Sequence, residues 1–189
     1  PEQHRSPCAL GTMAEGGASV GVTTRPNGAL TERWSSEEDV GIPIQAIRQI
    51  SFLRGLEHPN IARLLDVQWD AAGERLTLAY AACGVTLKEH LCSRGPLRGQ
   101  RLKMVAFQCV RGVQWLHCHG IAGLCLGVRG VRIDPISDHT VISNLKLSVS
   151  CFMECSRNVT LQEPWSGCPV DALLGGEISV AAAPRMDVW

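Results

Sequence analysis

Histidine and cysteine side chains gather in one part of the sequence, between residues 117 and 155. They are His117, Cys118, His119, Cys125, Cys151 and Cys155. Imidazole and thiolate groups are the ligands that zinc prefers, but the spacing of this set matches none of the common zinc patterns. The first three side chains are more simply the end of an amphipathic helix. The sequence therefore predicts neither a metal site nor a cofactor.

Covalent or acid–base chemistry in the same region also lacks support. A nucleophilic role for Cys125 would require a neighbouring base and a lowered thiol pKa, and the sequence indicates neither. Asp134, Asp138 and Glu154 are acids that could take up a proton, but each falls in a predicted loop. Because proton transfer demands strict placement of donor and acceptor, turn formation is the favoured interpretation of Asp134 and Asp138.

The length and charge of the chain limit the classes of protein that it can represent. A chain of 189 residues, 45% apolar and 19% charged, is long enough to bury a core in one domain or two small lobes. Eighteen basic residues balance eighteen acidic ones, so nucleic acid and anionic membranes are not predicted as partners. A local basic cluster is interpreted as the solvated face of a helix; it comprises Arg94, Arg98, Arg101 and Lys103.

The cysteine pattern bears on the compartment. The chain has nine cysteines, an odd number, and they form no CxxC pair. The N-terminal residues show no basic segment followed by an apolar run, and no apolar stretch is long enough to span a membrane. We therefore expect an intracellular protein with reduced thiols.

Two groups of elements are expected, separated by a connector. Strands are predicted within residues 10–22 and 29–34, a helix from Pro43 to about Glu57, and two strands at 61–69 and 75–82. Gly84 and the polar residues after it are expected to form the connector.

A second group of elements is expected beyond the connector. The clearest periodic element is a helix at 99–119, whose inner face is predicted to carry Leu102, Val105, Cys109, Val113 and Leu116. Short strands are predicted at 131–133 and 141–148.

The order of these elements and several local motifs resemble the cyclin-dependent kinase branch of the protein kinases. The segment GIPIQAIRQISFLRGLEHPNIARLLDV at 41–67 resembles that family's proline-headed helix and the His-Pro-Asn-Ile turn after it. RLTLAYAACGVTLKEHL resembles the strand and hinge between the kinase lobes, and FQCVRGVQWLHCHGI resembles the helix before the catalytic loop. Near the end, WSGCPVDALLGGEIS and MDVW resemble the Ala-Pro-Glu region and the start of the next helix.

The resemblance implies an α+β, two-lobed fold. Residues 1–80 would form a small lobe of β-sheet plus one helix, 81–86 a hinge, and 87–189 part of a helical large lobe. The chain would stop before or within the central helix of that lobe. Exposed apolar surface on the 99–119 helix would then need cover from a partner protein.

The resemblance also shows that the residues needed for phosphoryl transfer are replaced. The glycine-rich loop falls on residues 14–19, and the phosphate-gripping lysine falls on Trp34, or on Arg33 if the register shifts by one. The helix glutamate that holds this lysine becomes Gln49. The remaining positions are degenerate as well: Gly123, Leu124 and Cys125 for His-Arg-Asp, Gly127 for the loop lysine, Gly130 for the metal-binding asparagine, Val149, Ser150 and Cys151 for Asp-Phe-Gly, and Cys168, Pro169 and Val170 for Ala-Pro-Glu. Phosphoryl transfer depends on such positioning and charge, so catalysis is not expected.

Three functions follow from this comparison as hypotheses. The first is a cyclin-dependent kinase-like pseudokinase that acts as a scaffold or interaction subunit of a larger protein assembly. The second is a divergent serine/threonine kinase-related protein with residual ATP binding, held by hinge backbone near Ala81 and Cys83, or with weak activity. The third is the nonfunctional product of a decaying or mis-spliced gene.

A partner-binding surface is predicted on the helix that begins at Pro43. In the resembling family the equivalent helix docks against a cyclin, and Pro43, Ala46, Ile47 and Arg48 keep its pattern. The alternative is that Ile47 and Ile50 pack only on the small lobe. Ile44 distinguishes the two, because it is not needed for the predicted inner stripe of Ile47, Ile50 and Leu53.

Overall fold

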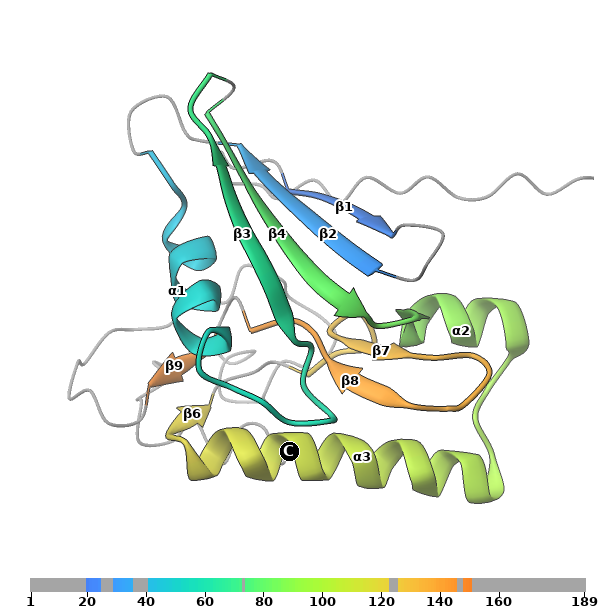
Figure 1. Cartoon of the computed structure of the whole chain (residues 1–189). Helices are drawn as coiled ribbons and strands as arrows, with labels where there is room; N and C mark the ends of the chain where they lie inside the picture. Colours follow the sequence, from blue (N-terminus) through green and yellow to red (C-terminus); the bar gives the residue numbers. More distant parts are fainter. Residues whose placement is uncertain are drawn as a thin grey trace, which may run out of the picture.

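An antiparallel four-stranded sheet carries the N-terminal half of the fold (Figure 1). The computed structural model describes residues 20–24, 29–35, 41–72, 74–122, 126–145 and 148–150. The strands are β1 (Val20–Thr24), β2 (Ala29–Ser35), β3 (Leu64–Asp70) and β4 (Arg75–Ala82), in the order β1-β2-β4-β3. The predicted β4 boundaries are confirmed, whereas β3 begins three residues later than predicted. The part of the 10–22 prediction before Val20 lies outside the described residues.

Helix α1 (Ile44–Leu53) lies beside β3 at the edge of this sheet (Figure 1). Pro43 occupies the N-cap, and its carbonyl oxygen accepts hydrogen bonds from the backbone N–H groups of Ala46 and Ile47. The helix buries Ala46, Gln49 and Leu53, which are spaced by three and four residues. The predicted inner stripe was therefore wrong at Ile47, which is 47% exposed. The buried face of α1 carries Gln49 instead.

The connector predicted after Gly84 contains a further helix, α2 (Leu87–Arg94). Thr86 caps it: the Thr86 hydroxyl accepts from the Glu89 backbone N–H at 3.1 Å, and the Glu89 carboxylate accepts from the Thr86 N–H at 2.8 Å. This capping box satisfies N–H groups that a helix start otherwise leaves without partners. The connector prediction did not include this helix, because the main signal for it is the local pair Thr86 and Glu89.

Helix α3 (Gly99–Cys118) crosses the lower part of the fold, beneath two small sheets (Figure 1). One sheet has the order β5-β7-β8 and the other pairs β6 with β9. The strands are β5 (Val85–Thr86), β6 (Ile121–Ala122), β7 (Val131–Ile133), β8 (Thr140–Ile142) and β9 (Val149–Ser150). The strand predicted at 141–148 was too long, because β8 ends at Ile142.

The inner face of α3 follows most of the predicted stripe. Val105, Val113 and Leu116 are buried, but Leu102 near the helix start is 50% exposed. Gly112 brings the helix close to its neighbours, since a Cβ there would lie 2.9 Å from the Asn60 carbonyl oxygen and 2.8 Å from the Ile142 side chain.

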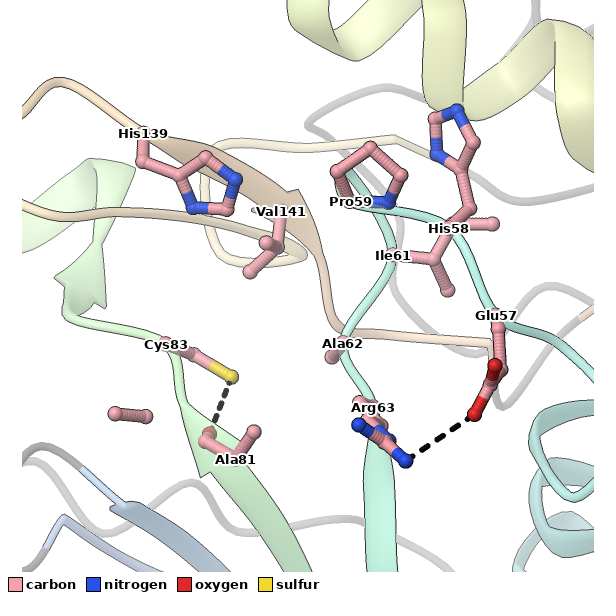
Figure 2. Close-up of a pocket in the computed structure, with 11 residues that line it drawn as sticks. Glu57, His58, Pro59, Ile61, Ala62, Arg63, Ala81, Cys83, His139 and Val141 are labelled. Atoms are coloured by element: carbon pink, nitrogen blue, oxygen red, sulfur yellow. Dashed lines mark hydrogen bonds and ion pairs between the residues drawn. The ribbon is translucent and has the colours of Figure 1, made fainter.

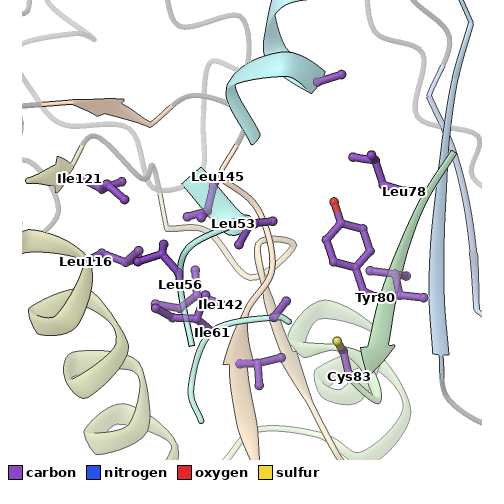
Figure 3. Close-up of a cluster of buried hydrophobic side chains, with 14 of the residues drawn as sticks. Leu53, Leu56, Ile61, Leu78, Tyr80, Cys83, Leu116, Ile121, Ile142 and Leu145 are labelled. Atoms are coloured by element: carbon purple, nitrogen blue, oxygen red, sulfur yellow. The ribbon is translucent and has the colours of Figure 1, made fainter. Parts of the chain in front are cut away.

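A single cluster of buried apolar side chains joins the upper sheet to the lower elements (Figure 3). Leu53 and Leu56 meet Leu116, Ile142 and Leu145 within this cluster. The cluster therefore spans both groups of elements. No helix among the described residues is long and apolar enough to cross a membrane.

The architecture is mixed α+β, with a four-stranded antiparallel sheet and three helices in the described residues. This arrangement is compatible with part of a two-lobed fold. Residues 81–86 link the two groups, and β5 within this link pairs with β7, Val85 opposite Ile133.

The link has little steric freedom at Gly84. Its φ is +69°, and an added Cβ would overlap the Ile133 carbonyl group, lying 2.7 Å from its carbon. Gly95 provides a comparison, since its φ is +80° but a Cβ there would meet nothing within 4 Å.

We therefore expect Gly84→Ala to destabilise the fold more than Gly95→Ala. Both variants place a Cβ at positive φ, which costs about 1–3 kcal/mol, and at Gly95 this φ is combined with a ψ of −172°. Only Gly84→Ala adds a backbone overlap, for which we expect a further loss of about 1–3 kcal/mol. Urea unfolding of the two variants measures the difference. Equal losses would mean that the chain relaxes around position 84.

Candidate functional site

A network of three polar side chains lies in the core between the sheet and α1. Glu32 on β2, Gln49 on α1 and Tyr80 on β4 are 6%, 0% and 1% exposed. The Gln49 amide nitrogen donates to a Glu32 carboxylate oxygen at 2.7 Å and also to the Tyr80 hydroxyl. The Tyr80 hydroxyl donates to the same carboxylate oxygen at 3.1 Å. Each side chain therefore contacts the other two.

Strand alternation explains why these groups converge. Leu30, Glu32 and Trp34 occupy alternate positions of β2 and share a face. In the β2–β4 register, Leu30 lies opposite Tyr80 and Glu32 opposite Leu78, so all of these side chains point toward α1. The face is apolar except for Glu32 and the Tyr80 hydroxyl, and Gln49 supplies the donor that a buried carboxylate requires.

Protonation of Tyr80 supports the same network. Burial, followed by the neighbouring Glu32 carboxylate, raises the pKa of Tyr80 above its ordinary value. The hydroxyl therefore stays protonated and remains a donor to Glu32. The Gln49 amide oxygen has no hydrogen-bond partner among the described residues, so the amide is held through its nitrogen, which faces the carboxylate.

Three neighbouring side chains of β2 bear on the position that the resemblance matches to the family's lysine. Trp34 is a buried core side chain, 3% exposed, and Arg33 is exposed. The β2 side chain bonded to Gln49 is Glu32. The match of Trp34, or of Arg33, to the family's lysine stays a prediction.

The charge at this position determines what the site can bind. A lysine at position 32 could attract phosphate, whereas a buried carboxylate repels it. Gln49 adds no charge. Among the described residues, this network therefore offers no cation to an anionic ligand.

The backbone near Ala81, in the link at 81–86, is partly occupied by internal hydrogen bonds. The Ala81 N–H donates to the Arg63 carbonyl oxygen at 3.0 Å, and the Cys83 thiol donates to the Ala81 carbonyl oxygen at 2.8 Å. Burial raises the pKa of the Cys83 thiol, which keeps it protonated as a donor. The Ala81 groups proposed for adenine already have partners.

A groove of about 390 Å³ opens beside this part of the chain (Figure 2). Its walls come from residues 81–83, from segment 57–63 and from His139 and Val141. Arg63 is paired with Glu57 at 3.2 Å. The charge of the arginine in this lining is therefore balanced, and the groove gives no specific indication of an anionic ligand.

The predicted catalytic-loop positions are described only in part. Gly123, Leu124 and Cys125 lie outside the described residues. Gly127 and Gly130 form a turn in which the Gly130 N–H donates to the Gly127 carbonyl oxygen at 2.9 Å. Gly130 is buried, and a Cβ there would already approach the Asn144 Cβ to 3.3 Å. This turn supplies no side-chain ligand for a metal.

The structure describes Val149, one of the predicted positions. It lies in β9, opposite Ala122 at the end of β6. Cys151 and the residues matched to Ala-Pro-Glu lie outside the described residues, as does the 14–19 loop.

Asp134 and Asp138 have structural roles, as the turn interpretation predicts. The Asp134 carboxylate accepts from the Ile136 N–H and the Ser137 hydroxyl, and the Ser137 bond lowers its pKa. Asp138 forms an ion pair with Arg101, which lowers the pKa of Asp138. Both carboxylates are committed to local structure, and Glu154 lies outside the described residues.

Soft metal ligands do not converge within the described residues, where no group of three His, Cys, Asp or Glu side chains could hold a metal ion. His119 bonds through Nδ1 to the Trp115 carbonyl oxygen at 2.8 Å, and Cys118 is exposed. Cys125, Cys151 and Cys155 lie outside the described residues.

The candidate partner-binding residues of α1 divide between two faces. Pro43 and Ala46 are buried and Arg48 is half-buried, whereas Ile44 and Ile47 are 57% and 47% exposed. The two isoleucines lie three positions apart and so share the outer face. The alternative that Ile47 packs inside was wrong, while Ile50 does pack against the core.

Sequence reasoning missed Glu32 and Tyr80. The available signal was Glu32 itself, a charged residue placed between Leu30 and Trp34 on the apolar face of a strand. A charge in that position requires a buried partner.

No protein-family model matches the chain.

A double-mutant cycle tests the network. Gln49→Glu places two carboxylates in contact in the core, and Glu32→Lys removes the acceptor. We expect each single change to cost about 3 kcal/mol or more. In the double variant, the lysine introduced at position 32 faces the glutamate introduced at position 49. This pairing should recover about 1–3 kcal/mol relative to the sum of the single losses.

The pH dependence gives a second readout. In Gln49→Glu, repulsion raises the pKa of one carboxyl in the folded state. The variant therefore gains stability relative to the parent as the pH falls toward 4, and loses it as the pH rises. Additive losses in the double variant would contradict the contact between positions 32 and 49. Chemical denaturation at several pH values measures both effects.

Proposed function

We propose that this chain is a cyclin-dependent kinase-like pseudokinase that acts as a non-catalytic scaffold or interaction subunit of a protein assembly. The buried Glu32 carboxylate carries this proposal. It faces Gln49, the residue matched to the family's helix glutamate, and so stands where the resemblance requires a lysine. A carboxylate–amide bond takes the place of the ion pair that would grip phosphate.

The fold is consistent with this proposal. The resemblance implies a small lobe of sheet plus one helix, followed by a hinge and a helix-containing lobe. The described residues give a four-stranded antiparallel sheet with α1, a short link at 81–86, and then α2 and α3. The interaction role is supported by the outer face of α1, where Ile44 and Ile47 are exposed.

We expect millimolar MgATP to leave the melting temperature unchanged. Ligand binding to the folded state would add about 2.7 kcal/mol at one hundred times Kd. Here the carboxylate of Glu32 opposes phosphate, and the Ala81 backbone groups are engaged. Thermal unfolding with and without MgATP measures the effect, with an active cyclin-dependent kinase as the positive control. A clear rise in melting temperature would instead favour residual nucleotide binding.

The α1 surface provides a test of the interaction role. We expect Ile44→Asp to release a bound protein partner, because a charge at an apolar anchor costs about 2 kcal/mol or more, roughly thirtyfold in affinity. Ile136→Asp is the matched control, since Ile136 is 91% exposed and far from α1 in sequence. Quantitative co-purification of partners with the parent and both variants measures the effect.

The folded state must be unchanged for this result to be interpreted. Circular dichroism and melting temperature should match among the three proteins, because Ile44 lies outside the buried face of α1. If Ile44→Asp keeps every partner that the parent binds, α1 is not a docking surface.

A further inference from the structure

The outer face of α3 is apolar although it points away from the core. Phe107 and Val110 are each 63% exposed, and Met104 is 42% exposed. They recur at three-residue intervals and so form one stripe along the helix. Gly112, Val113 and Leu116 pack inward, so the stripe lies opposite the buried face.

This face also has a single sign of charge. The sequence of α3 contains no Asp or Glu. Lys103 and Arg111 flank the stripe, and the Arg111 guanidinium lies 5.9 Å from the centroid of the Phe107 ring. Neither Lys103 nor Arg111 has an ion-pair partner within the part of the chain that the structure describes. Arg101 adds no net charge to this face, because it already forms an ion pair with Asp138.

We propose that the Met104–Phe107–Val110 stripe is a docking surface for an amphipathic helix of another protein, one whose apolar side chains are flanked by Asp and Glu. This inference rests on the proposed interaction role and names the chemistry of one partner. Packing of one helix face against the stripe supplies the apolar contacts. Complementary charge against Lys103 and Arg111 supplies the selectivity, because a basic helix would be repelled.

Two synthetic helical peptides test this inference on the full chain. They share one leucine stripe and differ only in the flanking residues, glutamate in one and lysine in the other. Fluorescence anisotropy should show that the glutamate peptide binds about tenfold more tightly or better, a difference of about 1.4 kcal/mol. Added salt should weaken this preference, because it screens exposed charges.

Variants locate the binding surface. Phe107→Asp should weaken binding of the glutamate peptide about tenfold or more, since a central apolar anchor is lost. Arg111→Glu should shift the preference toward the lysine peptide. Ile44→Asp should bind the glutamate peptide as the parent does, which separates this surface from α1. Circular dichroism should be unchanged in all three.

Several results would overturn the inference. Equal binding of the two peptides would contradict the proposed charge selectivity. Full binding of the glutamate peptide by Phe107→Asp would show that the binding surface lies elsewhere. Hydroxyl-radical labelling of Met104 and Phe107 in the free protein tests whether the chain itself, or a second copy of it, covers the stripe. Protection in a monomer would mean that the chain covers its own helix. Protection only where sedimentation shows self-association would mean that a second copy does so. We expect both side chains to be labelled in the free protein and protected by the glutamate peptide.

Discussion

The bond between the Gln49 amide and the Glu32 carboxylate is the constraint on which the upper half of the fold depends. This hydrogen bond, 2.7 Å long, joins α1 to β2 in a largely apolar interface. The Tyr80 hydroxyl of β4 donates a second hydrogen bond to the same carboxylate. A buried carboxylate without donors would cost several kcal/mol. The position of α1 on the sheet is therefore set by polar geometry as well as by the packing of Ala46 and Leu53.

The hydrogen bond between Glu32 and Gln49 also connects the stability of the fold to the proposed loss of phosphoryl transfer. A site that transfers phosphate keeps its charged groups accessible to the ligand. Here Glu32 and Gln49 bond to each other and to Tyr80, all within the core. This part of the interior is therefore a structural element, and the proposed interaction surfaces lie elsewhere, on the exposed apolar side chains of α1 and α3.

Periodicity in the sequence predicted much of this architecture. The β4 boundaries, the α1 start and most of the α3 inner stripe followed from alternation or helical spacing, since those patterns reflect burial directly. Helix α2 was missed because its amphipathic pattern is weak and its evidence is the local Thr86–Glu89 capping box. The site was predicted less well. Gln49 was named through the resemblance, but Glu32 was not, because the sequence alone does not show which side chain of β2 faces α1.

The charge arrangement in the core has a consequence for how such a chain can evolve. A lysine at position 32 without an acid at position 49 would be a buried cation beside an amide. An acid at position 49 without a lysine at position 32 would face Glu32 directly, because the hydrogen bond between the Gln49 amide and the Glu32 carboxylate is only 2.7 Å long. Either single replacement passes through a less stable protein. Each of the two residues therefore constrains the other: Glu32 selects against an acid at position 49, and Gln49 selects against a lysine at position 32.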